Sequence, residues 1–168
     1  MLDALDIQVL LVKDLIKAGR LEEAFREFNA LLARHADNGR VQALYGKLLF
    51  RYFSRIEEAE EAFRKAMRTE GSDVELYLDF AALLLQAGKY TDMVPVLNRA
   101  LEIPLISKEE IFALFGQLYE RQRNWDEAVE YYSRAALHTL SAESMEHYLA
   151  DRARVMKKRA FLIVDYNG

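Results

Sequence analysis

Apolar side chains recur every three or four residues along most of this chain, which is the spacing of one face of an α-helix. The clearest example covers residues 112–135. Its two successive stripes are Phe112, Phe115, Gly116 and Tyr119, followed by Trp125, Ala128, Tyr132 and Ala135. The small residues fall where two antiparallel helices would approach most closely, and the aromatic residues fall where the gap needs filling. We predict a helical hairpin here.

The same alternation of large and small residues recurs three times upstream, at steps of 35, 34 and 35 residues. The second-helix positions of the upstream copies are Met93, Leu97 and Ala100; Ala59, Phe63 and Ala66; and Ala24, Phe28 and Leu31. The first-helix positions are Gln8, Leu11, Val12 and Leu15; Gln42, Tyr45, Gly46 and Leu49; and Tyr77, Phe80, Ala81 and Leu84. Four consecutive hairpins are therefore predicted.

A repeat of about 34 residues with this alternation resembles the tetratricopeptide repeat (TPR) family over roughly residues 5–140. Each unit departs from the family pattern somewhere. Met93 replaces a small residue in the third unit, and Arg123 replaces the turn glycine that is present as Gly19 and Gly88. The resemblance implies an all-α fold, a right-handed superhelical solenoid of antiparallel helix hairpins.

We expect a single domain over residues 1–168, with repeats at about 5–38, 39–72, 73–107 and 108–141. The helices of the first three repeats are predicted at about 3–18, 21–34, 40–52, 55–68, 73–87 and 91–102. Gly19 is suited to the left-handed conformation that ends a helix. The Ser-x-x-Glu segments that start at Ser54, Ser72 and Ser107 are interpreted as capping boxes, which begin helices.

The segment after residue 141 does not complete a fifth hairpin. We predict one amphipathic capping helix at about 142–160 that covers the open end of the stack. The stripe predicted to pack inward is Met145, Leu149, Ala153, Met156 and Ala160. The tail at 161–168 is apolar from Phe161 to Val164, so it either folds back onto the last hairpin or meets another chain.

Composition is that of an ordered helical domain. The 168 residues are 52% hydrophobic and 30% charged, which is too apolar for a disordered chain. No cysteine is present, so disulfides, a thiol nucleophile and cysteine-based metal sites are excluded. The longest apolar run near the start, 9–12, is too short for a signal peptide or a membrane span. We expect a cytoplasmic protein with no integral membrane segment.

No motif for catalysis or for a cofactor is present: the chain lacks a phosphate-binding glycine loop, a nucleophile elbow, a His-Glu-x-x-His helix and a calcium loop. The three histidines, His35, His138 and His147, have no spacing that signals a shared metal. We therefore expect no enzymatic activity, no cofactor and no metal.

Binding to nucleic acid or to anionic lipid is also disfavoured. A basic cluster is present at Arg152, Arg154, Lys157, Lys158 and Arg159. However, residues 141–168 hold five basic and four acidic residues, and the net charge of the chain is −4. This balance gives little attraction to phosphates, and a solvated face of the capping helix explains the cluster better.

The TPR resemblance implies that the first helix of each hairpin lines a concave groove. The implied lining is Asp6, Val9, Lys13, Ile16 and Lys17; Arg40, Ala43, Lys47, Phe50 and Arg51; Glu75, Leu78, Asp79, Ala82 and Gln86; and Glu110, Ala113, Gln117, Glu120 and Arg121. Basic residues dominate the first half and acidic residues the second. The other interpretation of this pattern is the ordinary mixed surface of a solenoid.

The candidate contacts to a partner are Val9, Lys13, Lys17, Lys47, Phe50, Arg51, Leu78, Asp79, Gln117 and Glu120. The clamp by which some TPR modules hold the carboxylate tails of heat-shock chaperones is incomplete, because Lys13, Leu44 and Lys47 stand where it requires asparagine. We predict a noncatalytic protein-interaction module, an adaptor, scaffold or chaperone-like protein, whose groove binds a peptide or helix carrying acidic residues. The alternative is a self-assembly unit that uses the groove or the strip from Phe161 to Val164.

Overall fold

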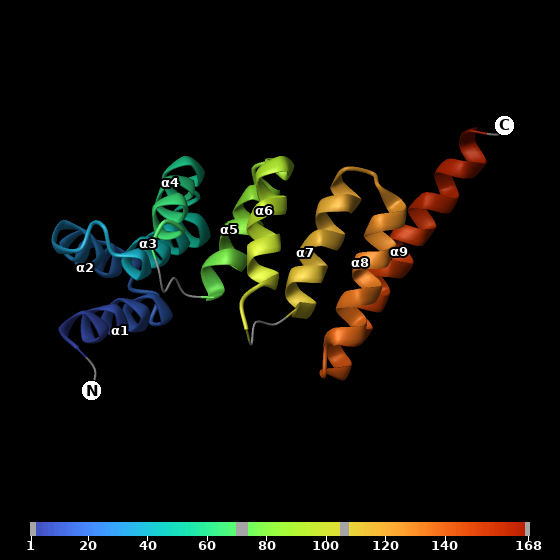
Figure 1. Ribbon diagram of the computed structural model, residues 1–168. Helices are drawn as coiled ribbons and strands as arrows, with labels where there is room; N and C mark the ends of the chain where they lie inside the picture. Colours follow the sequence, from blue (N-terminus) through green and yellow to red (C-terminus); the bar gives the residue numbers. More distant parts are fainter. Residues whose placement is uncertain (1–2, 70–73, 105–107, 167–168) are drawn as a thin grey trace. The chain divides into compact units, whose positions relative to one another are not determined.

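Every regular element is helical in the part of the chain that the structure, a computed structural model, describes. That part is the backbone of residues 3–69, 74–104 and 108–166, with their side chains except those of 74 and 163–166. Its helices are α1 (Ala4–Lys17), α2 (Leu21–Arg34), α3 (Gly39–Phe53), α4 (Ile56–Ala66), α5 (Val74–Gln86), α6 (Tyr90–Leu101), α7 (Lys108–Arg121), α8 (Trp125–His138) and α9 (Ala142–Tyr166) (Figure 1). The predicted all-α fold class is confirmed.

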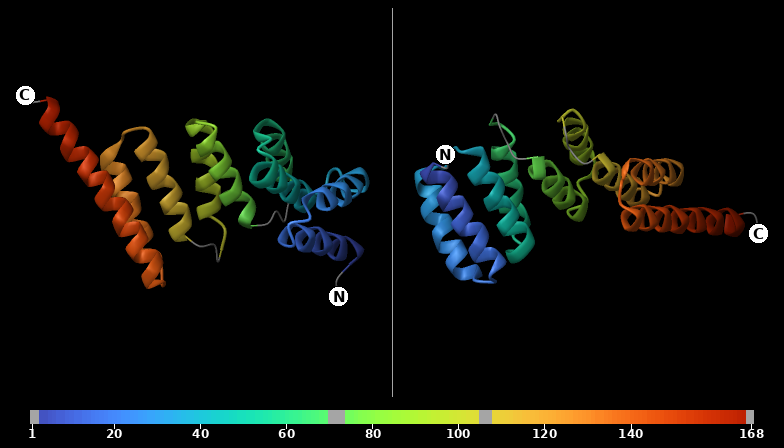
Figure 2. Two further views of the ribbon diagram at one scale, coloured as in Figure 1. Left: turned by 180° about the vertical axis from the view of Figure 1, so that it is seen from behind. Right: turned by 90° about the horizontal axis from the view of Figure 1, so that it is seen from below.

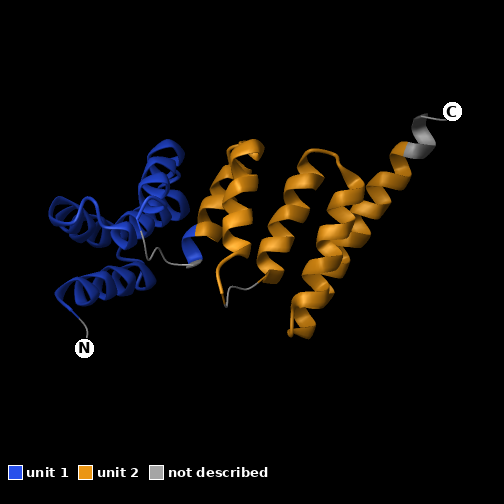
Figure 3. Cartoon of the chain, in the orientation of Figure 1, with its two compact units in different colours: residues 1–76 blue, residues 77–168 orange. Residues whose placement is uncertain are grey.

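The chain divides into two compact units (Figure 3). Unit 1 is Met1–Leu76 and contains α1 to α4, and unit 2 is Tyr77–Gly168 and contains α6 to α9. Helix α5 begins in unit 1 and continues into unit 2. The single domain expected from the sequence therefore stays a prediction about how the chain folds.

The turns inside all four described hairpins share one left-handed backbone conformation, with Ser54 at a φ of 53° in the second hairpin. Gly19 and Gly88 have φ values of 72° and 71°, and Arg123 has a φ of 59° at the equivalent place. Glycine adopts this conformation without a steric penalty, whereas a residue with a Cβ atom does not. Arg123 therefore occupies a glycine position, as the sequence comparison of the repeats indicated.

The predicted capping box at Ser54 is wrong. Ser54 ends α3 with a left-handed φ of 53°, and Arg55 precedes α4 without any side-chain cap. Ser54 therefore closes α3 rather than opening α4. The predicted boxes at Ser72 and Ser107 lie outside the described residues.

Close helix contacts are made by the small residues of the repeat. A Cβ atom built on Gly46 would lie 2.8 Å from the Phe63 ring, and one built on Gly116 would lie 2.9 Å from the Tyr132 ring. These distances are too short for a real side chain, so each glycine lets an aromatic ring of the second helix pack against the first. Figure 2 shows α3 beside α4 and α7 beside α8. The size pattern predicted for these two hairpins is confirmed.

Each unit has its own apolar core. In unit 1 it joins α1, α2 and α3 through Val12, Phe28 and Val41, among others. Leu11, which the repeat register placed in the core, is 48% exposed, because the neighbouring Val9 and Val12 turn inward instead. In unit 2 Tyr131 stacks on Phe115 with ring centroids 4.7 Å apart.

Helix α9 packs on α8, but not through the predicted stripe. Val155 is fully buried with Ala128 and Tyr132, whereas Met145, Leu149 and Met156 are 42%, 43% and 45% exposed. The two faces differ by roughly a quarter turn of the helix. The stripe prediction is wrong because it counted only apolar residues, and the packed face also uses charged ones.

The tail prediction is answered only in part. Helix α9 continues to Tyr166, so the backbone does not fold back at 161 as one alternative proposed. The side chain of Phe161 is 66% exposed. The side chains of Ile163 and Val164 lie outside the described residues.

Candidate functional site

In unit 1 two of the predicted basic residues, Lys13 and Lys47, act on one carboxylate, Glu75 of α5. The Lys47 Nζ atom lies 2.8 Å from Glu75 Oε2. The hydrogen bond from Lys47, with its charge and the charge of Lys13, lowers the pKa of Glu75. Lys17 is exposed on α1. This part of the predicted lining is therefore a mixed ionic surface that already contains its own acidic group.

The predicted apolar contacts of unit 1 are not available on the surface. Val9 and Phe50 are only 5% and 8% exposed, and Val9 belongs to the core that joins α1, α2 and α3. The Arg51 guanidinium lies 5.1 Å from the centroid of the Phe50 ring and covers it. In unit 2 Leu78 is half-buried and Asp79 is buried. A ligand would meet none of these four as an exposed apolar or acidic contact without a local rearrangement.

The remaining predicted residues, Gln117 and Glu120, line a pocket in unit 2. The pocket has a volume of about 510 Å³ and lies where the end of α7, the start of α8 and the middle of α9 meet. Its walls are Gln117, Glu120, Arg121, Arg123, Trp125, Tyr132, Arg154 and Lys158. Such a volume is within the range of pockets that hold small ligands or single side chains of a partner.

Glu120 is the centre of an ionic network in this pocket. Arg154 Nη2 donates to Glu120 Oε2 at 2.7 Å, and Lys158 Nζ donates to Oε1 at 2.8 Å. The Tyr132 hydroxyl donates to Oε2 at 3.0 Å. Arg154 also pairs with Asp151 on its own helix. The network ties α9 to the hairpin beneath it, and it fixes the orientation of two cations at the pocket wall.

The pKa values of the network follow from these contacts. Burial alone would raise the pKa of Glu120, but the hydrogen bonds from Arg154, Lys158 and Tyr132 outweigh it and lower the pKa to about 2. Burial and the neighbouring Glu120 carboxylate raise the pKa of the Tyr132 hydroxyl. The hydrogen bond to Glu120 raises the pKa of Arg154. At neutral pH Glu120 is therefore ionised, Arg154 is charged, and the Tyr132 hydroxyl keeps the proton that it donates.

Two further cations line the pocket without an internal partner. Arg121 and Arg123 are exposed and make no ion pair with any described residue. The lining therefore carries four cations against one carboxylate, in a chain whose net charge is −4. Arg123 moreover has a left-handed backbone conformation, which is about 1 kcal/mol or more less favourable for a residue other than glycine. Strain of this kind persists at sites where the side chain has a role.

Sequence reasoning missed several residues of the pocket. Trp125 and Tyr132 were interpreted as core residues, and Arg154 and Lys158 as the solvated face of a capping helix. One signal could have found Arg154: it lies 34 residues after Glu120, one repeat further along. Continuing the repeat register past residue 141 would have placed Arg154 at the groove position of a fifth first helix.

The histidines do not form a site with one another. His138 lies edge-on to Phe112 with centroids 4.9 Å apart, and His147 lies 3.5 Å from Asp151. Within the described ranges, no group of three or more histidine, aspartate or glutamate side chains is placed to hold a metal ion. Among the same residues, no helix has both the length and the apolar character needed to cross a membrane.

Comparison with known proteins places this architecture in a class. No family model matches the chain. Its sequence is 31% identical over 121 residues to the Vi polysaccharide export protein VexE of Salmonella typhi, a match that covers 69% of this chain and 18% of that protein. The chain thus spans less than a fifth of the length of this curated relative.

Solved structures show the fold more directly. PilF of Pseudomonas aeruginosa superposes with a TM-score of 0.78 at 18% identity, covering 95% of this chain and 71% of that one. A tetratricopeptide repeat protein of Parabacteroides merdae superposes with a TM-score of 0.77 at 18% identity, covering 97% and 64%. Together with the repeat in the sequence, these likenesses show that the chain has the TPR fold. Helical arrays of this kind serve in general as protein-interaction scaffolds.

Proposed function

We propose that the chain is a noncatalytic protein-interaction module and that the pocket of unit 2 binds an acidic segment of a partner protein. The observation that carries the proposal is the lining of this pocket, in which four cations surround a single, fully compensated carboxylate. Arg121 and Arg123 supply the charge that a ligand carboxylate would meet. Guanidinium groups bind carboxylates through two parallel hydrogen bonds, which gives both strength and orientation.

The pocket also offers an apolar contact. Trp125 is half-buried in its wall, next to the turn that holds Arg123. Aromatic and arginine side chains are the residues that most often dominate binding energy at protein interfaces. The ligand that fits is a segment with carboxylates beside an apolar side chain. Trp125 supplies the apolar contact of this site in place of Phe50 and Leu78, the apolar residues among the contacts predicted from the sequence.

The basic surface of unit 1 is a second candidate contact for an acidic segment. Lys13, Lys17, Lys47 and Arg51 keep the positive charge predicted for it, although Glu75 offsets part of that charge. Contacts of this exposed kind steer association and weaken with salt. We propose that unit 1 contributes to the rate of association and that the unit 2 pocket holds the complex.

A fluorescence anisotropy titration with a short labelled peptide of alternating glutamate and leucine tests this assignment. The double reversal Arg121→Glu, Arg123→Glu should weaken binding by at least about 10-fold, or about 1.4 kcal/mol. The double reversal Lys47→Glu, Arg51→Glu should slow association with a smaller effect on the dissociation rate. The control is Arg26→Glu, Arg68→Glu, which makes the same change in net charge at two exposed arginines that do not line the pocket.

The comparison of the variants decides the site. If Arg121→Glu, Arg123→Glu binds the peptide as tightly as the control variant, the pocket is not the binding site. If instead only the unit 1 variant loses affinity, the site is the surface predicted from the sequence. A glutamine–leucine peptide that binds equally well would show that carboxylates are not recognised.

The proposed place of action is the cytoplasm, where cell fractionation should recover the chain. The alternative function is self-assembly through the groove or through the strip from Phe161 to Val164, in which the Phe161 side chain is 66% exposed.

A further inference from the structure

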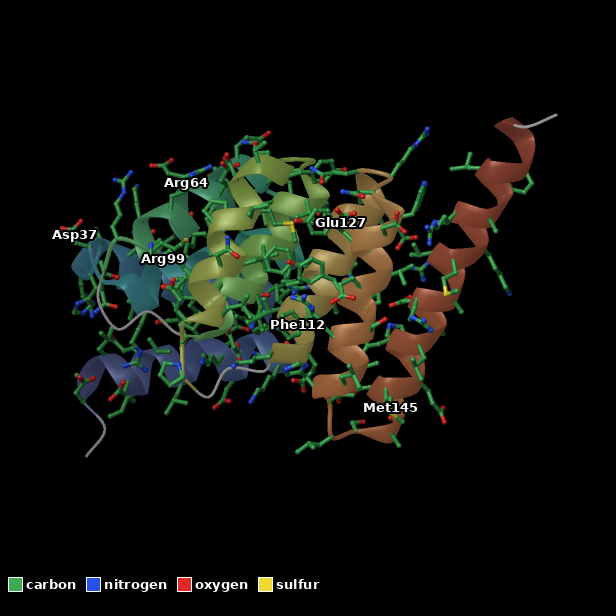
Figure 4. All side chains as sticks on the ribbon, turned by 45° about the vertical axis from the view of Figure 1, so that its right-hand side comes forward. Asp37, Arg64, Arg99, Phe112, Glu127 and Met145 are labelled. Carbon is green, nitrogen blue, oxygen red and sulfur yellow. The ribbon has the colours of Figure 1, made fainter. Side chains whose placement is uncertain are left out.

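Helix α9 carries an apolar face that is partly exposed among the residues that the structure describes. Met145, Leu149 and Met156 are each more than two-fifths exposed, while Val155 on the neighbouring face is fully buried. Figure 4 shows side chains of α9 that project away from α8, and it labels Met145 near the start of the helix. Arg152 lies at the edge of this face, is half-buried and makes no ion pair with a described residue, and its Nε atom is buried without a hydrogen-bond partner.

Helix α1, in the other unit, carries a face of the same kind. Ile7, Leu10 and Leu11 are 58%, 45% and 48% exposed. Asp14 lies within this face, is exposed and makes no ion pair with a described residue. Ala18 extends the face by one more turn.

The two faces have one spacing and opposite charges. On α1 the face reads Ile7, Leu11, Asp14 and Ala18, and on α9 it reads Met145, Leu149, Arg152 and Met156. In both helices the charged residue follows the first apolar residue by seven positions. When two helices pack side by side in parallel, residues at equal offsets face each other. Such a pair would set Ile7 against Met145, Leu11 against Leu149 and Asp14 against Arg152.

The charges also disfavour a contact between two α9 helices or between two α1 helices. Two parallel α9 helices would oppose Arg152 to Arg152, and two parallel α1 helices would oppose Asp14 to Asp14. An antiparallel α9 pair centred on the same face sets Arg152 against Leu149, so neither arginine meets a carboxylate. Like charges at such an interface cost affinity, whereas opposite charges fix the partner and the register.

We propose that the α9 face binds the α1 face of a second copy of this chain, with Asp14 opposite Arg152. The contact is heterologous, so each chain offers one donor face and one acceptor face. A contact between two single helices buries less than the roughly 1,600 Å² of a standard interface. We therefore expect association at concentrations of about 10–500 µM rather than a permanent assembly.

Sedimentation velocity across a concentration series of the full chain tests the proposal. The wild-type chain should associate, and Asp14→Arg and Arg152→Asp should each weaken self-association by at least about 10-fold. An equimolar mixture of these two variants should associate again, because the arginine introduced on α1 of one chain then faces the aspartate introduced on α9 of the other. The control Glu22→Arg makes the same charge change as Asp14→Arg, on the exposed surface of α2, and should behave as wild type.

Each alternative has its own signature. If Asp14→Arg associates like the wild-type chain, α1 is not the occupant and the proposal fails, in favour of an α9–α9 contact. If the wild-type chain stays monomeric throughout the series, the α9 face binds something other than a second copy, and the proposal also fails. Circular dichroism confirms that each variant is folded. These outcomes do not depend on the pocket, because neither Asp14 nor Arg152 lines it.

Discussion

At the scale of single residues, Gly116 sets how closely α7 and α8 approach. The Tyr132 ring occupies the space in which a side chain on Gly116 would lie. Gly116→Ala should therefore destabilise unit 2 by about 1–3 kcal/mol through overpacking. Urea unfolding followed by circular dichroism measures the change.

A second variant distinguishes overpacking from a helix effect. Tyr132→Leu replaces the ring that the new methyl group would meet with a smaller side chain. Gly116→Ala should therefore lower the free energy of unfolding less in the Tyr132→Leu background than in the wild-type protein. Equal costs in both backgrounds would contradict the proposed contact. Alanine is the better helix former, so a stabilised Gly116→Ala variant would contradict it too.

Also at the residue scale, Glu120 should make stability depend on pH. Its folded pKa of about 2 is below its ordinary value of 4.5, so the folded state favours the ionised form. The resulting stabilisation is present above pH 4.5 and is lost as the pH falls toward 2. We expect Glu120→Gln to cost about 1–2 kcal/mol at neutral pH, after allowance for solvent screening, and to flatten the pH dependence in this window.

Chemical denaturation at several pH values measures this dependence. Glu127→Gln is the matched control, since Glu127 is an exposed carboxylate of α8 (Figure 4). Its stability should lie within about 0.5 kcal/mol of wild type. A Glu120→Gln profile that runs parallel to wild type from pH 4.5 to 2 would show that the ionic network does not stabilise the fold.

At the scale of elements, the rotation of α9 decides which of its residues hold it in place. Val155 is fully buried, and the adjacent Met156 is 45% exposed. Val155→Ala should cost about 1–3 kcal/mol, whereas Met156→Ala should cost less than about 0.5 kcal/mol. Thermal melting of the two variants at low protein concentration measures both.

The pair of variants tests the packing directly. The stripe predicted from the sequence requires the reverse order, with the larger loss at Met156. Such a result would support the capping helix predicted from the sequence. It would also show that the α9 face used in the self-association proposal is buried.

At the scale of the whole molecule, the expectation of a single domain concerns cooperativity. Helix α5 runs through the boundary between the two units, so we expect unfolding of one unit to destabilise the other. Gly46→Ala overpacks the α3–α4 hairpin of unit 1, where the new Cβ would meet the Phe63 ring. It should therefore also lower the unfolding midpoint reported by Trp125, the single tryptophan, which lies in unit 2.

Tryptophan fluorescence and far-ultraviolet circular dichroism, recorded on the same urea titration, provide the two readouts. Coincident transitions that shift together support one cooperative domain. A Trp125 transition that stays at its wild-type midpoint while the dichroism curve splits would show two independently folding units.

The repeat, the hairpins and most helix ends could be predicted from the amino-acid sequence without any structure. These features are local: the spacing of apolar residues sets each helix face, and small residues mark the close contacts, as at Gly46 and Gly116. The comparison of the repeats also predicted the glycine position in the turns and its replacement by Arg123. Contacts within one repeat are repeated along the chain, so the pattern reports them several times over.

The rotation of α9 and the composition of the pocket became visible only in three dimensions. Arg154 and Lys158 bind Glu120, which lies 34 and 38 residues earlier in the chain. The spacing of apolar residues does not predict a helix face that packs through charged side chains. The inward orientation of Val9 and Phe50 was equally hidden, because a groove position and a core position differ by a small rotation of one helix. Local periodicity determines which elements form, whereas burial and long-range ion pairs determine how each element is turned.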